Sequence, residues 1–497
     1  MDILERDALE VLCLVRFLKN SFAPINRIPP EVLSLIPNHY NTDYVDRGLI
    51  TLTHVCRGWR EIFISHSSLW THLNLTNIEK TRAYIQRSKS SPLNIRVENR
   101  GSEIYLNHTL PLVIPHVPRL KSFVVHTAAI PHILRHFRCH APLLERLDIG
   151  NTSPHAQILD NALFDGDLSP LRDLSLVGVV TNLPWTNMAN LTGFMLFCPP
   201  GHEVTVTRLL DFFESAPLLH TLNLINSTPN SSDASPKRIV PLHNLNTLSY
   251  SGVSAHPILT HLYIPTGASL NVWTTFGGQS SPLLDYLLEP PPNFKNLSHI
   301  TTLNFCFESK RAQLIGPNGS LRLSLDWDDQ VITSSSMGHR TLRSLGPQLL
   351  STTQQLTISG YVHRSPANVG ECPLLLTLSY VNNLRTLVLS ECKIKPFISA
   401  LNPERHLSKL VLCPSLKEIV VYRELWYNTK DLVSMSRGRA LRGAKLSSIT
   451  MIGSGIPLPE TEILGLREHV THVEYRTEIE PLTWDYIPDE SGSRFRE

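Results

Sequence analysis

The sequence contains residue types that could carry out chemistry, but not at the spacing that known chemistry needs. The stretch Gly438 to Lys445 has the two glycines of a phosphate-binding loop. Ala444, however, stands where that motif requires lysine, and no serine or threonine follows Lys445 to hold magnesium. The sequence also lacks a serine nucleophile elbow, a paired-histidine zinc motif and a dinucleotide-binding glycine fingerprint. We therefore expect a protein that is not an enzyme and that needs no cofactor.

A group of histidines is the other candidate for chemistry. His132, His136 and His140 follow one another at intervals of four residues. Cys139 lies directly beside the last of them. Metal sites also depend on residues that orient the ligands, and sequence does not reveal those. We interpret the segment as a polar helix or loop ahead of a strand, with a metal site as the alternative.

Length and charge limit the class of protein. With 497 residues, the chain is long enough for about two to four domains or for one repeat array. The 45 basic residues nearly balance the 43 acidic ones, so we expect no nucleic-acid partner and no attraction to anionic membranes. A run of about 18 uncharged apolar residues is absent from the sequence, so no membrane span is expected.

Cysteine usage and the first residues indicate the compartment. The eight cysteines are scattered and include no C-x-x-C pair, which is typical of reduced thiols in an intracellular protein. Asp2, Glu5 and Asp7 make the start acidic, whereas a signal peptide begins with basic residues. We expect the protein in the cytoplasm, in the nucleus or in both.

Residues 1–24 are predicted to form an amphipathic helix. Apolar residues recur there at helical spacing, namely Leu4, Ala8, Val11, Leu12, Val15 and Leu18. We expect this helix to pack on the helical segment that follows it. Self-association is the alternative, although three full heptads of a regular coiled-coil pattern are absent.

Residues 25–70 are predicted to form a small module of short helices. Pro29 and Pro30 suit a first helical turn, whose N–H groups lack partners in any case. Glu31 adds a negative charge that favours this helix end, and Pro37 terminates the helix. A second helical periodicity comprises Leu49, Ile50, Leu52, Val55, Cys56, Trp59, Ile62 and Phe63. Because so small a module buries little area alone, it needs a partner or a larger neighbour.

This segment resembles an F-box, the short helical module that docks on the Skp adaptor of cullin-based (SCF) ubiquitin ligases. The matching residues are Ile28-Pro29, Pro30 to Leu33, Val55-Cys56 with Trp59, and Leu69-Trp70. The loop from Pro37 to Asp46 is longer than in the shortest family members, as in F-box-like proteins of fungi. The resemblance implies binding to a Skp-type adaptor, and through it to a cullin. The implied contact residues are Ile28, Pro29, Val32, Leu33, Ile36, Val55, Cys56 and Trp59.

A repeat dominates the rest of the chain. Nine segments have a leucine followed three and five positions later by further apolar residues, and they begin at Leu120, Leu144, Leu171, Leu191, Leu219, Leu245, Leu384, Leu416 and Leu446. The first six are 20 to 28 residues apart, within the range of leucine-rich repeats, while the last intervals, 32 and 30, are longer. One unit cannot bury its own apolar face, so the units are predicted to stack around a shared core.

The pattern resembles leucine-rich repeats and implies an α/β repeat fold. In this interpretation the helical F-box module precedes an irregular solenoid with a parallel sheet over residues 71–476, and 477–497 form a tail. Apolar spacing in Val206 to Ser215 predicts an outer helix. The periodicity blurs between 251 and 355, where weaker strands start at Ile300, Leu321 and Gln355. The polar stretch 227–236 is predicted to be a loop.

Three functional hypotheses follow. The first is a substrate receptor of a ubiquitin ligase, which holds an unknown target protein on outward strand positions. The candidate contacts are Arg146, Asp148, Asp173, Asn223, Glu418 and Tyr422. The second is a repeat scaffold without a role in ubiquitination, in which the helical module only caps the array. The third is an enzyme with an unrecognised site, which no cluster of nucleophile, base and orienting group supports.

Overall fold

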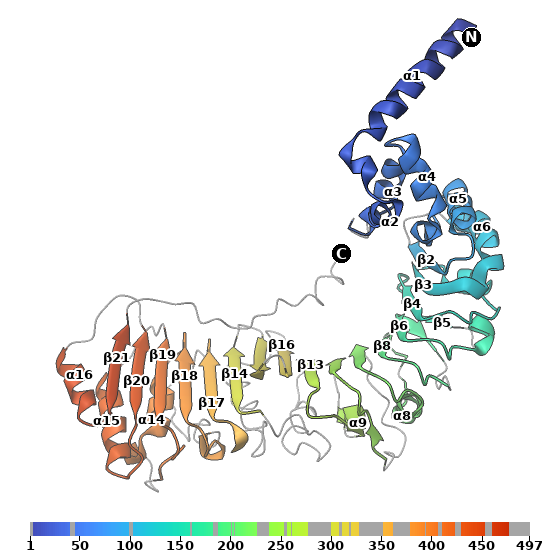
Figure 1. Cartoon of the computed structure of the whole chain (residues 1–497). Helices are drawn as coiled ribbons and strands as arrows, with labels where there is room; N and C mark the ends of the chain where they lie inside the picture. The colour runs from blue at the N-terminus through green and yellow to red at the C-terminus, as the bar shows by residue number, and fades with distance from the viewer. Residues whose placement is uncertain are drawn as a thin grey trace. The chain divides into compact units, whose positions relative to one another are not determined.

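The computed structural model combines helices with long runs of parallel strands (Figure 1). It describes residues 3–39, 45–98, 103–159, 162–181, 187–199, 201–202, 204–225, 238–252, 256–259, 261–276, 300–307, 311–317, 320–327, 351–360, 378–392, 394–405, 410–422, 429–452 and 460–476. The chain divides into two compact units, Met1–Leu191 and Thr192–Glu497. The loop expected at 227–236, residues 40–44 of the loop expected at 37–46 and the tail 477–497 lie outside the described residues.

Unit 1 begins with a helical region, as the sequence predicts. Pro30 opens the short helix α2 and Glu31 lies in its first turn, in agreement with the expected helix start. The helical elements of this region are α1 (Ile3–Ser21), η1 (Pro24–Arg27), α2 (Pro30–Leu33), η2 (Ile36–His39), α3 (Val45–Thr53), α4 (Arg57–Ser65) and η3 (Ser67–Trp70).

The first helix does not pack as expected. Every side chain of α1 from Glu5 to Ser21 is exposed, whereas the sequence favoured packing on the next helices. The physical reason is that its apolar residues lie all round the helix. Leu9 and Phe17 lie on the side opposite Val11 and Val15, so one flat surface could not bury them all.

The rest of unit 1 is a parallel sheet with helices beside it. Its strands pair in the order β1 (His72–Asn74), β2 (Leu93–Glu98), β3 (Leu120–Thr127), β4 (Arg146–Asn151) and β6 (Asp173–Val177). A separate parallel pair joins β5 (Gln157–Ile158) to β7 (Val179–Val180). The helices are α5 (Ile78–Ser88), α6 (Glu103–Val113), η4 (Ile114–Arg119), α7 (Ile130–Leu134) and η5 (Leu163–Gly166).

The repeated leucines of unit 1 align into buried rows. Ile95, Phe123, Leu147 and Leu174 are register partners on successive strands, as are Val97, Val125, Ile149 and Leu176. All eight side chains are at most 2% exposed. The spacing of the repeat therefore places its apolar residues at equivalent positions of one sheet, as the sequence predicts.

Unit 2 contains a longer run of strands. They pair in the order β8 (Gly193–Phe197), β9 (Thr221–Ile225), β11 (Thr247–Ser251), β13 (Ser269–Phe276), β16 (Leu321–Trp327), β15 (Arg311–Ile315), β14 (Thr302–Phe307), β17 (Gln355–Ser359), β18 (Thr386–Ser390), β19 (Glu418–Tyr422), β20 (Ser448–Ile452) and β21 (His472–Arg476). The arrows of β17 to β21 point the same way in Figure 1.

Helices and a short strand pair complete the described part of unit 2. The strand pair is β10 (Val240–Pro241) with β12 (Leu262–Tyr263). The helices are α8 (Val206–Ser215), α9 (His256–Leu259), α14 (Lys395–Leu401), η8 (Pro403–Arg405), α15 (Thr429–Ala440) and α16 (Glu460–Arg467). The predicted outer helix is α8, which begins at Val206 and packs Phe212 on Phe194 of β8, with 4.4 Å between ring centroids.

The blurred part of the repeat is where the strand directions change. The strands predicted near Ile300, at Leu321 and at Gln355 are present as β14, β16 and β17. Between the first two lies β15, which is antiparallel to both neighbours. The expectation that all strands run in one direction is therefore wrong at β15. The Gly316 N–H donates to the Leu321 carbonyl at 2.7 Å, which links the end of β15 to the start of β16.

Candidate interaction surfaces

The helical module has an apolar core of its own. Trp59 is 8% exposed and Phe63 is fully buried, and their rings meet edge to face with centroids 5.7 Å apart. The Trp59 Nε1–H donates to Oδ1 of Asn26 at 2.6 Å, which satisfies the buried indole. Leu33, Leu49 and Leu52 complete this core.

The module is also anchored to helix α5, which lies beside the sheet. Trp70 is fully buried, and its Nε1–H donates to the Phe63 carbonyl at 2.8 Å. The Tyr84 ring of α5 meets the Trp70 ring edge to face at 4.9 Å, and the Arg87 guanidinium lies 4.3 Å from the Trp70 ring centre. The Ser-Leu-Trp ending matched to the F-box thus joins the module to the sheet.

Exposed apolar side chains are concentrated at the beginning of the chain. Thirteen of the twenty large apolar side chains that are exposed among the described residues lie between Leu9 and Val55. Five of them belong to the helical module, namely Ile25, Val32, Leu35, Ile50 and Val55, which are 40 to 54% exposed. Such a concentration is a mark of an interaction surface.

The predicted adaptor contacts divide between this surface and the core. Val32, Val55 and Pro29 are exposed, and Ile28, Ile36 and Cys56 are half-buried. Leu33 is only 2% exposed and, like Trp59, belongs to the module's own core. Those two residues therefore stabilise the module and are not free to contact a partner in this conformation.

Three of the predicted target contacts lie on two neighbouring strands of unit 1. Arg146 and Asp173 are register partners on β4 and β6. Nη2 of Arg146 lies 3.6 Å from Oδ2 of Asp148. Outward residues of β1, β2, β3, β4 and β6 form a surface that we call the charged face. It comprises His72, Asn74, Asn94, Arg96, Glu98, Ser122, Val124, His126, Arg146, Asp148, Asp173 and Ser175.

Two residues that sequence reasoning missed complete the centre of the charged face. His126 Nε2 lies 3.1 Å from Oδ1 of Asp148. The His126 ring lies next to Gly150, its register partner on β4. A Cβ atom at Gly150 would lie 2.7 Å from Cδ2 of His126, so glycine leaves the space that the ring occupies. The register of the repeats, which makes His126 the partner of Gly150, was the available signal.

The electrostatics favour an ionised Asp148. Burial raises the pKa of its carboxyl. This increase is outweighed by contributions that lower the pKa, namely a hydrogen bond and charge from His126, a hydrogen bond from Ser175 and the charge of Arg146. The net result is a pKa below the ordinary value. The charged face thus holds a fixed anion between a histidine and an arginine.

The other predicted target contacts lie in unit 2. Asn223 is half-buried on β9, and Glu418 is exposed on β19, where it accepts a hydrogen bond from Oγ1 of Thr386 at 3.2 Å. Tyr422, also on β19, is only 5% exposed. Tyr422 therefore offers little surface for contact, although it lies at an outward strand position.

The first strands of unit 2 present a different outward surface, which we call the uncharged face. Its residues on β8, β9, β11 and β13 are half-buried and none is charged, and they are Gly193, Met195, Phe197, Thr221, Asn223, Ile225, Thr247, Ser249, Ser251, Ser269, Asn271 and Trp273. The apolar members, such as Phe197 and Trp273, offer contact area without charge.

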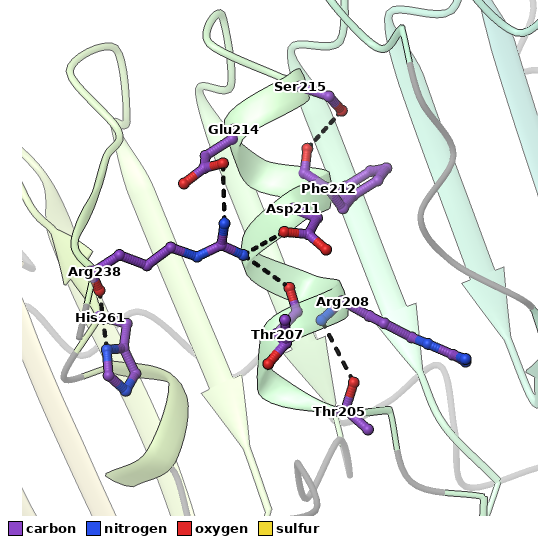
Figure 2. Close-up of polar contacts among 9 residues, drawn as sticks. All are labelled: Thr205, Thr207, Arg208, Asp211, Phe212, Glu214, Ser215, Arg238 and His261. Atoms are coloured by element: carbon purple, nitrogen blue, oxygen red, sulfur yellow. Dashed lines mark hydrogen bonds and ion pairs between the residues drawn. The ribbon is translucent and has the colours of Figure 1, made fainter. Parts of the chain in front are cut away.

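An ion-pair cluster in unit 2 joins α8 to the chain beside β10 (Figure 2). The Arg238 guanidinium contacts Asp211 and lies 3.2 Å from Oε2 of Glu214, and it donates to the Thr207 carbonyl at 3.1 Å. The Arg238 carbonyl in turn lies 3.0 Å from Nδ1 of His261. Because Thr207, Asp211 and Glu214 all belong to α8, we interpret the cluster as one that stabilises the packing of this helix.

The histidine cluster lacks the geometry of a metal site. His132 Nε2 lies 2.7 Å from Oδ1 of Asn107, and His140 Nδ1 lies 3.6 Å from Oδ2 of Asp167. Burial, together with Arg135 and His132, lowers the pKa of His136. Among the residues that the structure describes, no three histidine, cysteine or acidic side chains gather to hold a metal ion.

The segment that imitates a phosphate loop is a helix end. Arg439, which is fully buried, donates from Nη1 to the Leu412 carbonyl at 2.7 Å and from Nη2 to the Cys413 carbonyl at 2.8 Å. Gly443 has φ +76° just beyond α15, where the Ala444 N–H donates to the Arg439 carbonyl at 3.0 Å. Glycine at this position ends a helix, as is common.

Comparison with known proteins finds neither a protein-family model nor a curated protein that matches this chain. The function is therefore inferred from the residues and their arrangement. Within the described part of the chain, none of the helices combines the length and apolar character that crossing a bilayer requires.

Proposed function

We propose that the chain is the non-catalytic substrate-recognition subunit of an SCF-type ubiquitin ligase. Residues 25–70 would serve as an F-box-like module that binds a Skp-type adaptor. The observation that carries the proposal is the division of the motif-matched residues, with Leu33 and Trp59 in a closed core and Val32 and Val55 exposed. A motif whose buried residues support exposed apolar ones is suited to docking.

The energetics of docking follow from the exposed side chains. Each fully buried valine or leucine contributes roughly 1.5–3 kcal/mol, and Val32 and Val55 are about half exposed before docking. Leu35, Ile50 and Ile25 can add to the same interface. Such a subunit contributes to ubiquitin transfer by positioning, because it holds the bound target at high effective concentration near the enzyme that carries ubiquitin.

For residues 71–476 we propose an irregular leucine-rich-repeat-like solenoid that holds the target protein. The support is the repeated register of apolar residues, which recurs in unit 2 for Phe194, Leu222, Leu248 and Leu270, and again for Leu356, Leu387, Ile419, Ile449 and Val473. The antiparallel β15 interrupts the array and is a departure from that family's pattern. The candidate target surfaces are the charged face and the uncharged face.

Titration calorimetry of the full chain with a purified Skp-type adaptor tests the proposal. The double substitution Val32→Glu with Val55→Glu should weaken binding at least about thirtyfold, since anchor residues typically contribute roughly 2 kcal/mol. Leu143→Glu with Leu218→Glu is the matched control, because these leucines are 47% and 43% exposed and lie outside the module. Equal affinities of the two double variants would contradict the docking assignment.

The competing function is a repeat scaffold in which the module only caps the sheet. The contacts of Trp70 with Tyr84 and Arg87 favour it, because both residues lie on helix α5, beside the sheet. A cap and a docking module are compatible roles. A wild-type chain that does not bind the adaptor would leave the scaffold as the function.

A further inference from the structure

Helix α1 is a long helix with no cover among the described residues. Its exposed apolar side chains are Leu9 (50%), Val11 (62%), Leu12 (44%), Leu14 (58%), Val15 (56%), Phe17 (53%) and Leu18 (50%). Most of the stability of a protein helix comes from the packing of its apolar face, and this holds for the 19 residues of α1. The side chains of α1 therefore call for a partner that the described residues of unit 1 do not supply.

The spacing of α1 fits a helical partner. Ala8, Val11, Val15 and Leu18 follow at intervals of three, four and three residues, which places them in one line along the helix. Leu12 and Leu14 border this line on its two sides, so the apolar strip is widest at the middle of the helix. A line with this spacing is the contact seam of a two-helix coiled coil.

The seam is complementary to itself in the antiparallel direction. When two copies cross at residue 13, Ala8 faces Leu18 of the second copy and Val11 faces Val15 of the second copy. The same arrangement brings Glu5 near Lys19 of the second copy, at both ends of the seam. Opposite charges thus border an apolar middle, as in stable antiparallel pairs.

The distribution of charge argues against the parallel direction. Glu5, Asp7 and Glu10 lie in the first half of α1, with Arg6 as the one basic residue there, and Arg16 and Lys19 lie in the second half. Parallel copies would align the acidic halves with each other and the basic halves with each other, which costs free energy. The antiparallel arrangement pairs each acidic half with a basic half.

We propose that α1 is a self-association helix that joins two copies of this chain as an antiparallel, two-fold symmetric pair. The proposal goes beyond the adaptor function and does not depend on it. Because α1 precedes the helical module in the chain, a dimer formed there would carry two modules and two sheets. Two sites in one assembly would raise the avidity for a target that has two recognition segments.

Sedimentation velocity of the full chain over a concentration series tests the proposal. The wild-type chain should form a dimer, and Val11→Glu with Val15→Glu should raise the dimer dissociation constant at least about tenfold. Leu9→Glu with Phe17→Glu is the matched control, since it places the same charges on the opposite side of α1 and should leave the dimer intact. Equal loss of the dimer in both double variants would overturn the proposed seam.

Charge exchange tests the orientation. Glu5→Lys and Lys19→Glu should each weaken the dimer about threefold, and their combination should restore it, because exposed charge pairs contribute modestly. Failure of the combined variant to recover would overturn the antiparallel arrangement. A wild-type chain that stays monomeric would overturn the proposal itself. The same holds if the chain is monomeric and α1 binds the adaptor or lipid vesicles instead of a second copy.

Discussion

The outward surface of the first strands of unit 2 differs from that of unit 1, although the buried rows are alike. On β3, β4 and β6 of unit 1 the outward residues include His126, Arg146, Asp148 and Asp173, and on β8 to β13 of unit 2 none of the corresponding residues is charged. The inward rows are apolar and buried in both units. The comparison teaches that stacking constrains only the inward positions and leaves the outward ones available for recognition.

The difference has a consequence for any bound partner. Attraction to the charged face is screened by salt, because its groups are exposed or half-buried. Contact with the uncharged face depends on apolar area around Phe197 and Trp273 and is affected little by salt. The salt dependence of target binding would therefore indicate which of the two faces is used.

Truncation of an inward leucine should have the largest effect, and a similar one in both units. Leu147→Ala in β4 and Leu222→Ala in β9 remove side chains that are fully buried, so each should lower the free energy of unfolding by about 2–5 kcal/mol. Denaturant unfolding of the full chain measures the change. If one variant were close to wild type, the two buried rows would not be equivalent.

Substitution at the centre of the charged face should have a smaller effect that depends on pH. Asp148→Asn should lower the free energy of unfolding by about 1 kcal/mol at neutral pH, because the carboxylate loses its charge beside His126 and Arg146. The lowered pKa means that this stabilisation is complete above the ordinary aspartate pKa. It is lost as the pH falls through the lowered value.

The matched control for this prediction lies in the uncharged face. Asn223→Ala changes a half-buried outward side chain of β9 that has no charge, and it should alter stability by less than about 0.5 kcal/mol at any pH. A pH-independent loss in Asp148→Asn, or a pH-dependent loss in Asn223→Ala, would contradict the electrostatic difference between the faces.

The smallest effect is expected at Gly150. Gly150→Ala places a methyl group 2.7 Å from Cδ2 of His126, so the half-exposed ring should swing away from Asp148. Most of the strain is relieved by that movement, and the loss of stability should be below about 1 kcal/mol. The pKa of Asp148, followed by NMR titration, should rise because the largest lowering contribution is removed. An unchanged pKa would show that His126 does not hold the carboxylate.

Much of the fold could be predicted from residue spacing. The leucine pattern predicts the strands at Leu147, Leu222 and Leu387, because an apolar residue at a repeated position has to be buried by its neighbours. The strand β15 was not predictable, since Arg311–Ile315 lacks the leucine pattern. Spacing predicts elements more reliably than it predicts their direction.

The candidate surfaces were predicted less completely. The motif positions include Val32 and Leu33, which are neighbours in sequence, yet the first is exposed and the second buried. Only the packing of the helices decides that division. Likewise, Asp148 could be named from its outward position, but the role of His126 depends on the absence of a side chain at Gly150.

Hydrogen–deuterium exchange of the full chain with and without a purified Skp-type adaptor tests the central claim most directly. We predict slower exchange at Glu31 to Leu35 and at Leu52 to Trp59, where exposed Val32 and Val55 would be covered. Exchange in β4 and β9 should stay unchanged, because the proposal assigns those strands to target binding and not to the adaptor. Unchanged exchange in the helical module, in a mixture where the adaptor is in excess, would contradict the proposal that this module docks on it.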